Sequence, residues 1–395
     1  MSNRFKISFQ TSAFTGAVFL MATSAIGPGF ITQTTVFTTE LLASMGFVIL
    51  CSVIIDIIAQ LNIWQILAGH RKKASELANQ EIPGSGHFLT LMICFGGLAF
   101  NIGNIAGAGM GMSILLPVSL KTGSIISAVI AVSIFASANA QKAMDVFVKI
   151  LGMVMLGMTL LVVCFTAPPW TEIIYRSVIP EKIQFTAIIA LVGGTVGGYI
   201  SFAGANRLLD ANDDHLLQPA QVRKQAIRGI LLTACMRVLL FLAVLGVVYH
   251  GFVPNNENPA ASVFQKALGT KGFFVFGLVL WCASITSVVG AAYTSVSFLE
   301  TLHAAFKKHI KILQIAFVVS ATIVFMFWGK PIKVLVMAGV VNGFILPFAL
   351  VLMLWSAMRS KNQVASGSKW LNISGWAVAL LMLCMSVIAL FSEFF

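Results

Sequence analysis

The chain has 395 residues, of which 58% are hydrophobic and 10% are charged, and its formal net charge is +12. A soluble globular domain carries about 25% charged residues, so the composition excludes a water-soluble globule. Lysine and arginine lie in short clusters between long apolar runs, which is typical of membrane loops and not of a nucleic-acid-binding surface. The six cysteines lie inside apolar runs without a C-x-x-C pair, so they indicate neither a disulfide scaffold nor a zinc or redox site.

A helix needs about 20 apolar residues to cross the hydrocarbon core of a bilayer. Apolar runs of that length predict eleven membrane-spanning helices, and therefore an all-α integral membrane protein. The first run is too long for a cleavable signal peptide and has no small-residue exit site. In chain order the predicted spans are roughly residues 12–40, 44–69, 88–116, 122–139, 144–166, 184–203, 229–250, 271–301, 312–329, 332–356 and 371–392.

An odd number of spans places the two ends of the chain on opposite faces of the membrane. With the amino terminus in the cytoplasm, sixteen of the 25 lysines and arginines fall on the cytoplasmic face and seven on the other. Basic loops resist translocation, so this bias supports both the number of spans and their orientation. We expect a multi-pass protein of the cell (inner) membrane with its amino terminus in the cytoplasm and its carboxyl terminus on the opposite face.

Two of the predicted spans contain runs that interrupt a helix. The first span carries G-P-G-F at 27–30 followed by T-Q-T-T at 32–35, and the sixth carries G-G-T-V-G-G-Y at 193–199. Such breaks are tolerated in a membrane where the freed backbone groups face protein or a watery cavity. Because the two breaks are five spans apart, they predict a five-plus-five inverted repeat with a binding site at the midplane, between the broken helices.

This repeat predicts a single transmembrane transporter domain, residues 1–395. The first repeat is expected at about 12–166, the second at about 184–356, and an extra helix at about 371–392. The alternative is that the glycines only allow helices to pack closely. For Gly107, Gly109 and Gly111 of the third span, we favour that packing role.

The chain resembles the NRAMP family of proton-coupled divalent-metal transporters over most of its length. The resemblance is strongest at residues 25–38, 59–78, 101–116, 225–251, 284–290 and 334–354, and includes L-P-F-A-L at 346–350. It implies the LeuT-type fold of two inverted five-helix repeats, with helices 1 and 6 broken. Eleven spans and a cytoplasmic amino terminus, which bacterial members have, agree with the apolar runs and the charge distribution.

The functional residues of that family are replaced here. The family's first-helix motif D-P-G-N aligns with G-P-G-F here, and its sixth-helix motif M-P-H aligns with G-G-Y. The acidic pair of its third helix aligns with two asparagines. Two glutamines of its tenth helix align with glycine and isoleucine. The altered positions are Gly27, Phe30, Gly197, Gly198, Tyr199, Asn101, Asn104, Gly339 and Ile345.

Divalent cations leave water only for several oxygen, nitrogen or sulfur donors, usually with at least one carboxylate. The aligned positions no longer supply such donors, and all six histidines lie in loops or at the ends of spans. We therefore expect no site for bare Mn²⁺ or Fe²⁺. A divalent cation taken as a hydrated ion, Mg²⁺- or Mn²⁺-like, stays open as the alternative cargo, because Mg²⁺ keeps several waters and needs few direct ligands.

A helix broken at glycines exposes N–H groups and a positive half-helix end, both of which favour anions. In LeuT-type amino-acid carriers, the resemblance implies that such a break receives the carboxylate of the substrate. We expect a small organic carboxylate, such as an amino acid or a 5-oxoproline-like molecule, with an aromatic ring over its apolar body. The candidate substrate-binding residues are Gly27, Gly29, Phe30, Gln33, Asn101, Asn104, Gly197, Gly198 and Tyr199.

Two charged residues lie within predicted spans, Asp56 in the second and Arg237 in the seventh. Charges in the hydrocarbon usually pair or mark an ion path, and these two helices are counterparts in the predicted repeat. An Asp56–Arg237 pair is thus possible, either as a fastener between helices or as a coupling site at which Asp56 accepts a proton or Na⁺. The hydroxyls of Ser284 and Thr286 in the eighth span are candidate Na⁺ ligands, or else bond to carbonyls of their own helix.

The leading interpretation is a secondary transporter, expected as a symporter that acts by alternating access and as a monomer. Its expected partners are a small-molecule or ion substrate and the lipid bilayer, with no nucleic acid and no cofactor. An enzyme is not expected, because no titratable or nucleophilic cluster lies at one depth. A channel or a non-transporting membrane protein is the second alternative. The chain has no G-x-x-x-x-G-K-[ST] motif for driving transport with ATP.

Overall fold

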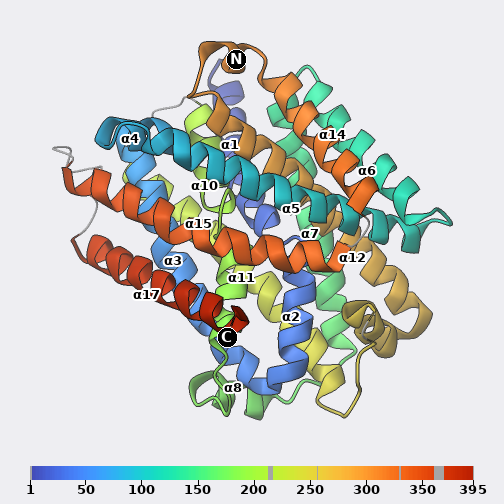
Figure 1. Ribbon diagram of the computed structural model, residues 1–395. Helices are drawn as coiled ribbons and strands as arrows, with labels where there is room; N and C mark the ends of the chain where they lie inside the picture. Colours follow the sequence, from blue (N-terminus) through green and yellow to red (C-terminus); the bar gives the residue numbers. More distant parts are fainter. Residues whose placement is uncertain (1, 212–216, 256, 329–330, 360–368, 395) are drawn as a thin grey trace.

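A computed structural model describes residues 2–394, apart from 212–216, 256, 329–330 and 360–368 (Figure 1). Within the described residues the chain forms helices and connecting loops, without a strand. Lys330 and Lys361, which enter the predicted sorting of charges between the two faces, lie outside the described residues.

Each of the eleven predicted spans overlaps one helix or one pair of helices. In the described chain, eight helical stretches are long and apolar enough to cross a membrane, and three shorter apolar helices, Ala13–Ala25, Leu120–Ala136 and Lys369–Met385, accompany them. The elements are α1 (Ser2–Ala25), α2 (Pro28–Leu41), η1 (Leu42–Ser44), α3 (Met45–His70), α4 (Ala74–Glu81), α5 (Ser85–Leu115), α6 (Leu120–Ala136), α7 (Ala140–Cys164), α8 (Trp170–Val178), α9 (Phe185–Thr195), α10 (Ile200–Asp210), α11 (Pro219–Val248), α12 (Pro259–Leu299), α13 (Ala304–Lys308), α14 (Ile310–Trp328), α15 (Pro331–Arg359) and α17 (Lys369–Phe394).

α1, α11 and α12 begin well before the apolar runs that predict them. α11 starts at Pro219 and α12 at Pro259, each with proline in the first turn, where its missing N–H removes no helical hydrogen bond. The Asn258 side chain caps α12 by accepting a hydrogen bond from the backbone N of Ala261 at 3.2 Å. α12 then kinks at Gly269, whose φ is +62°, and the segment after the kink matches the predicted eighth span.

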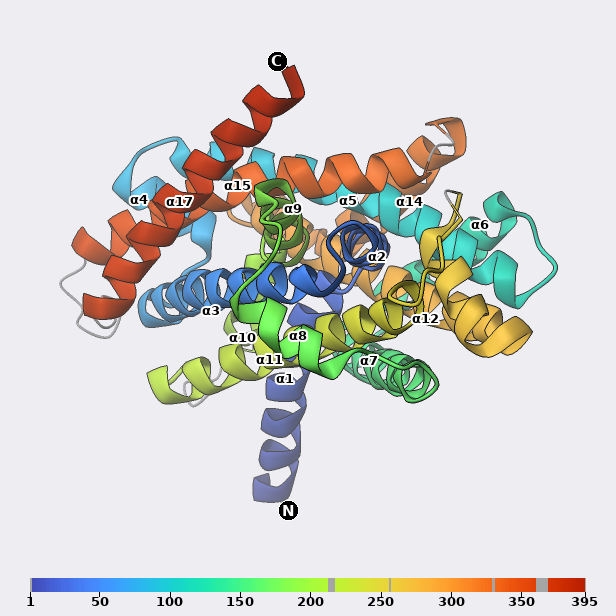
Figure 2. The ribbon, with the colours of Figure 1, turned by 90° about the horizontal axis from the view of Figure 1, so that it is seen from below.

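Both predicted breaks are present. α1 ends at Ala25 and α2 begins at Pro28, while α9 ends at Thr195 and α10 begins at Ile200. In Figure 1, α1 occupies the upper half of the bundle and α2 the lower half, so the first break lies near the middle. Seen from below in Figure 2, α2 and α9 lie side by side near the centre, and the two helices are in contact. The half-helices of the two broken spans thus meet inside the bundle.

The ends of the described chain lie at opposite ends of the bundle. In Figure 1, α1 starts at the top, whereas α17 finishes in the lower half. An odd number of spans predicts such a separation, and the face of the membrane on which each end lies stays a prediction.

Small residues let α5 and α12 pack along each other. A β-carbon on Gly107 would lie 2.6 Å from the Ser284 hydroxyl, and one on Gly111 would lie 2.6 Å from the backbone N of Trp281. Gly109 faces α6, where a β-carbon would lie 2.6 Å from a backbone oxygen. The packing role predicted for these three glycines is confirmed, because any side chain would force the helices apart.

Candidate functional site

The start of α2, just after the first break, has no capping side chain. Gly27 is the N-cap of this helix and Pro28 is its first residue, and no side chain bonds the N–H groups of the first turn. A β-carbon on Gly27 would lie 3.2 Å from both Asn104 Oδ1 and Ser287 Oγ. Polar side chains from α5 and α12 thus approach a helix end that carries partial positive charge.

Asn101 and Asn104 lie one turn apart on α5 and are 0% and 1% exposed. Neither the amide nitrogen nor the amide oxygen of either residue forms a hydrogen bond within the described structure. A buried polar group without a partner costs about 1–3 kcal/mol, and such groups are normally satisfied. An unpaired amide beside an uncapped helix start therefore marks a place where a solute or water is expected to bind.

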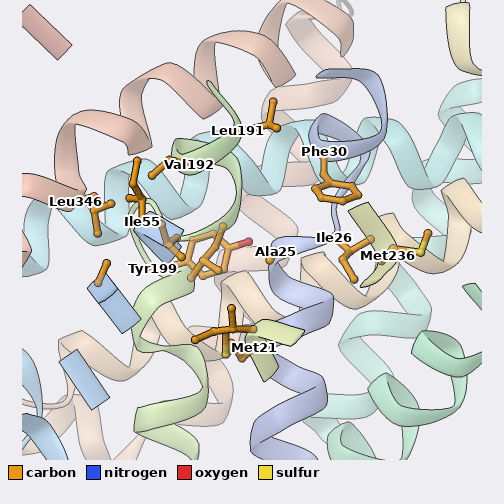
Figure 3. Close-up of a cluster of buried hydrophobic side chains, with 14 of the residues drawn as sticks. Met21, Ala25, Ile26, Phe30, Ile55, Leu191, Val192, Tyr199, Met236 and Leu346 are labelled. Carbon is orange, nitrogen blue, oxygen red and sulfur yellow. The ribbon is translucent and has the colours of Figure 1, made fainter. Parts of the chain in front are cut away.

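Tyr199, directly after the second break, reaches across to the first broken helix. Its hydroxyl donates a hydrogen bond to the backbone oxygen of Ser24 at 3.4 Å. Its ring packs edge-on against Phe100, with ring centroids 5.9 Å apart, and its phenol lies near Asn104. Figure 3 shows Tyr199 among the buried side chains of both broken helices, close to Ala25. The sequence predicts that the two breaks meet, and in the structure the Tyr199 side chain joins them.

Packing against α15 accounts for the glycines of the second break. Gly198 has a φ of +55°, in the left-handed region that favours glycine, and a β-carbon there would collide with the side chain of Asn342. A β-carbon on Gly197 would lie 2.6 Å from the backbone oxygen of Asn342. The role of both glycines in binding a substrate stays a prediction. The sequence interpretation missed Asn342, although a lone amide in an apolar span was the available signal.

Gln33 connects the helix after the first break to the helix before the second. It is 5% exposed, and its Oε1 lies 3.0 Å from where a β-carbon of Gly194 would be. In the same polar run, the hydroxyls of Thr32 and Thr35 donate to carbonyls one turn back in α2, at 3.0 and 2.9 Å. Those threonines therefore satisfy their own helix, whereas Gln33 faces α9.

Asp56 and Arg237 lie together between the two breaks. Both are buried, and Arg237 Nη2 is 3.6 Å from Asp56 Oδ2. The Thr195 hydroxyl, at the end of α9, donates to Asp56 Oδ2 at 3.0 Å, and Arg237 Nη1 donates to the Ser52 hydroxyl. The guanidinium carbon lies 5.5 Å from the centre of the Phe30 ring on α2. The two intramembrane charges thus pair, and each contacts one of the broken spans.

The hydroxyls of the eighth predicted span have different surroundings. Thr286 donates to the Cys282 carbonyl of its own helix at 2.7 Å, which is the commoner role of such a hydroxyl. Ser287 donates to the backbone oxygen of Thr23 at 2.8 Å and so satisfies a carbonyl in the last turn of α1. Ser284 Oγ has no hydrogen-bond partner in the described structure. A Na⁺ site at Ser284 and Thr286 stays a prediction.

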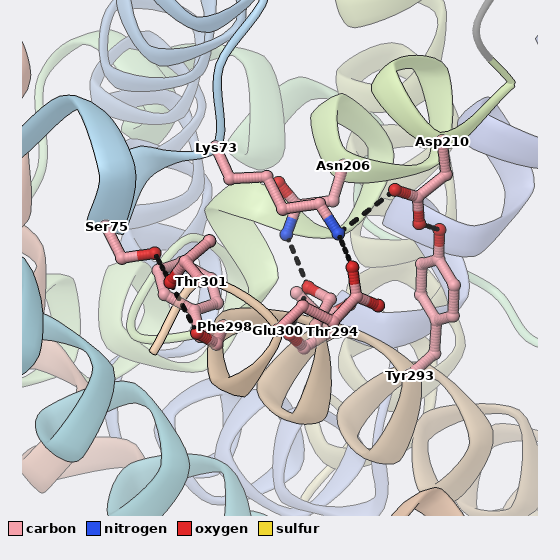
Figure 4. Close-up of polar contacts among 10 residues, drawn as sticks. Lys73, Ser75, Asn206, Asp210, Tyr293, Thr294, Phe298, Glu300 and Thr301 are labelled. Carbon is pink, nitrogen blue, oxygen red and sulfur yellow. Dashed lines mark hydrogen bonds and ion pairs between the residues drawn. The ribbon is translucent and has the colours of Figure 1, made fainter. Parts of the chain in front are cut away.

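A polar cluster at one end of the bundle was not predicted. Lys73 Nζ lies 3.0 Å from Asp210 Oδ1 and 2.6 Å from Glu300 Oε2, and the Tyr293 hydroxyl donates to Asp210 Oδ2 at 2.5 Å (Figure 4). Burial lowers the pKa of Lys73, but the two carboxylates raise it by more, so its pKa lies above the ordinary 10.5. The residues come from three separate parts of the chain, and no spacing in the sequence connects them.

A cavity in the same region borders α10, the second half of the sixth predicted span. Asp145, near the start of the fifth predicted span, is 4% exposed and accepts two hydrogen bonds from Arg207, at 3.0 and 2.6 Å. Both line this cavity, which measures about 520 Å³. On the α2 side of the first break, the cavity lined by Pro28, Thr32 and Gly107 measures about 20 Å³. The cavity beside Arg207 is therefore larger than the space beside Thr32, and its lining residues do not include those of either break.

The donors around the breaks do not match those of a metal centre. Among the described residues, no group of three or more His, Cys, Asp or Glu side chains is placed to hold a metal ion. The groups that meet at the breaks are amides, hydroxyls, a phenol, backbone N–H groups and a single carboxylate, Asp56, which is paired with Arg237. This chemistry suits hydrogen bonding to an organic solute, whereas a dehydrated dication needs several charged or soft donors.

Comparisons with known proteins agree on one family and one fold. Residues 18–392 match the model of the family described as "Natural resistance-associated macrophage protein-like". The uncharacterised membrane protein YcsG of Bacillus subtilis (strain 168) is 49% identical over 384 residues, which cover 97% of this chain and 95% of that protein.

Two solved structures are similar to this one at low sequence identity. The manganese transporter of Eremococcus coleocola, in complex with an aromatic bis-isothiourea compound, is 14% identical, with a TM-score of 0.76 over 97% of this chain and 87% of that one. MhsT in complex with L-phenylalanine is 16% identical, with a TM-score of 0.65 over 94% of this chain and 98% of that one. The predicted fold class, an all-α membrane protein of the LeuT type with two broken helices, is confirmed.

Proposed function

The chain belongs to the natural resistance-associated macrophage protein-like (Nramp) family, and we propose that this membrane transporter carries a small organic carboxylate. An amino acid or a 5-oxoproline-like molecule is the favoured cargo. The observation that carries the proposal is the unpaired amide of Asn104, 3.2 Å from the β-carbon position of Gly27 at the uncapped start of α2.

The groups at the first break suit the two ends of such a molecule. The N–H groups of the first turn of α2 and the helix dipole stabilise a carboxylate, and the amide of Asn104 donates one more hydrogen bond. Asn101, one turn away, and the phenol of Tyr199 supply acceptors for an N–H or hydroxyl group of the same molecule. Phe30, 3% exposed, covers an apolar body.

A divalent metal fits these positions less well. Glycine, tyrosine and asparagine stand where the resemblance to the metal transporters places carboxylate, thioether and imidazole groups. The similarity to the manganese transporter concerns the fold alone, since the identity is 14%. The same fold holds an organic amino acid in the MhsT complex. A hydrated divalent cation and a channel are therefore the outcomes that the experiment below must separate from carboxylate transport.

The unequal cavities on the two sides of the breaks support alternating access. A cavity of about 520 Å³ reaches Arg207, while the space beside Thr32 is about 20 Å³. In the proposed cycle, the first repeat, at about 12–166, moves relative to the second, at about 184–356. The extra helix at about 371–392 belongs to neither repeat. The clustered basic residues favour a cytoplasmic amino terminus, which assigns the larger cavity to the cytoplasmic side of the cell membrane.

Uptake by purified protein in sealed liposomes tests the proposal. We expect saturable uptake of radiolabelled L-5-oxoproline or of a labelled L-amino acid, and no saturable uptake of Mn²⁺ or Mg²⁺. Unsaturable flux would indicate a channel instead. Uptake of Mn²⁺ with none of the carboxylates would refute the proposal.

Matched variants connect the uptake to the site. Asn104→Leu keeps the size of the side chain but removes both hydrogen-bonding groups, so carboxylate uptake should be lost while the protein still folds. The control is Ser133→Ala on α6, whose hydroxyl bonds the Ile130 carbonyl of its own helix far from the breaks. Equal uptake by both variants would exclude the assigned site.

A further inference from the structure

Two buried aspartate–arginine pairs in this protein differ in how well they are matched. Arg207 bonds Asp145 through two nitrogens, at 3.0 and 2.6 Å, which is the bidentate geometry of a structural pair. Arg237 approaches Asp56 at 3.6 Å through one nitrogen. Arg237 Nε and Nη2 and Asp56 Oδ1 form no hydrogen bond in the described structure. The second pair therefore keeps unused binding capacity in a fully buried place.

Both pairs contact both broken spans, but the Asp145–Arg207 pair does so away from the breaks, through Arg207 itself on α10 and against Gly16 of α1, whereas the loosely matched pair does so beside them. Asp56 accepts a hydrogen bond from Thr195, the last residue of α9, and Arg237 lies over the ring of Phe30 in the first turn of α2. In both broken spans these contacts lie next to the break. A change in the pairing is thus transmitted directly to the half-helices that surround the proposed substrate.

The charge balance limits what can enter this interior. Asp56 and Arg237 together are neutral, so a carboxylate brings one uncompensated negative charge into a desolvated place, which is costly. If that carboxylate binds the unused edge of Arg237, Asp56 loses its partner. An unpaired buried carboxylate takes up a proton, because the neutral acid needs no counter-charge.

Arg237 is the charged group that acts on Asp56. Among the described residues, it is the one whose charge is felt by the Asp56 carboxylate, and α9 carries no charged residue. α3 and the helices packed against it carry further titratable or charged groups with described side chains. They are Cys51, His70, Glu40, Glu76, Glu81, Glu172, Tyr175, Arg176, Tyr199, Arg207, Asp210, Arg223, Lys224, Arg228, Cys235, Arg359, Lys369 and Cys384.

We propose that Arg237, which lies over the ring of Phe30 in the first turn of α2, binds the carboxylate of the substrate together with the N–H groups of that turn, and that Asp56 carries one co-transported proton, so that each carboxylate crosses with one proton. This inference rests on the proposed function and names its coupling ion. On the outer side, Asp56 gains a proton from water as the carboxylate takes its place at Arg237. On the cytoplasmic side the carboxylate leaves, and Asp56 returns its proton to water and pairs with Arg237 again. For a monoanionic substrate the cycle moves no net charge.

The test uses the full-length protein in liposomes that contain a trapped pH-sensitive dye, with radiolabelled L-5-oxoproline as the probe. A pH difference of about one unit, acidic outside, supports accumulation of up to about tenfold at one proton per substrate. We expect accumulation near that limit, acidification of the lumen with each uptake, and no response to a potassium–valinomycin potential. Accumulation that follows the potential or a Na⁺ gradient would overturn the inference.

Substitution of the two charges separates their roles. Asp56→Asn imitates the protonated acid, so it should still exchange labelled for unlabelled substrate at equal pH while losing pH-driven accumulation. Arg237→Gln should lose exchange as well. Because that variant leaves Asp56 unpaired, the double variant Asp56→Asn/Arg237→Gln serves as its folded counterpart and should bind no substrate.

The matched control is Asp145→Asn, the same change in the bidentate pair. This variant should lower the yield of folded protein, but the protein that does fold should still accumulate substrate together with a proton. Proton-driven accumulation by Asp56→Asn, or exchange by the folded double variant, would overturn the inference. Carboxylate uptake by the wild type without proton entry would refute this inference alone, whereas the absence of carboxylate uptake would refute the proposed function with it.

Discussion

Tyr199 and Ser24 join the two broken helices, because the tyrosine hydroxyl donates to the backbone carbonyl of Ser24 at 3.4 Å. Ser24 lies in the last turn of α1, where carbonyls lose their helical partners. Ser287 of α12 donates to the neighbouring Thr23 carbonyl in the same way. Side chains from elsewhere in the bundle therefore satisfy the exposed end of the first half-helix, and a bound solute must fit beside them.

Tyr199→Phe tests whether this hydroxyl serves the substrate or only the fold. The ring contact with Phe100 is kept, and the lost hydrogen bond is long, so the free energy of unfolding should fall by at most about 0.5–1.5 kcal/mol. Carboxylate uptake should fall by roughly tenfold, the effect of one lost hydrogen bond to the substrate at about 1.4 kcal/mol. Thermal unfolding in detergent and liposome uptake measure the two effects. Unchanged uptake would restrict Tyr199 to a structural role.

Asn104→Asp restores an acidic side chain at a position where the metal-transporting relatives carry one, as the resemblance implies. A carboxylate 3.2 Å from the Gly27 position competes with an anionic substrate for the start of α2. Organic carboxylate uptake should therefore drop further than in Asn104→Ala, which is neutral. Initial rates of uptake for both variants provide the measurement, and equal rates would count against an anionic substrate at this break.

Gly198→Ala should destabilise the protein. Its φ is +55°, and a β-carbon would collide with Asn342, so both backbone strain and overlap oppose alanine. We expect a loss of about 1–3 kcal/mol. Gly157→Ala on α7 is the control, since a β-carbon there meets nothing within 4 Å. Alanine is the better helix former, so that variant should unfold at the same or a higher temperature.

Lys73 should stabilise the polar cluster throughout the neutral range and lose this effect in strong alkali. Its pKa in the folded protein lies above the ordinary 10.5 because Asp210 and Glu300 outweigh the effect of burial. A raised pKa means that the folded state holds the proton more tightly, so the contribution is complete below 10.5 and disappears as the pH rises through the folded value. The difference in unfolding temperature between wild type and Lys73→Met, followed against pH, measures this loss. A difference that vanishes near neutral pH would contradict the assignment.

The two buried aspartate–arginine pairs differ in how far the sequence alone could predict them. Asp56 and Arg237 stand alone in long apolar runs, so their unusual positions were evident and their pairing was a possible outcome. Asp145 lies near the start of an apolar run and Arg207 just after the end of another, where charges are ordinary, so neither position indicated a buried pair. Their bidentate pair exists because α7 and α10 both pack against α1, which no local pattern records.

Apolar run lengths and helix-breaking residues determined the number of spans, the places of the two breaks and the membrane location, because bilayer thickness and backbone satisfaction act on the chain locally. The tertiary structure alone decided which groups surround those breaks. Asn342 fills the space beside Gly198, Ser287 approaches Gly27, and Thr195 holds Asp56. These contacts join helices far apart in sequence, and their distances depend on packing that periodicity does not encode.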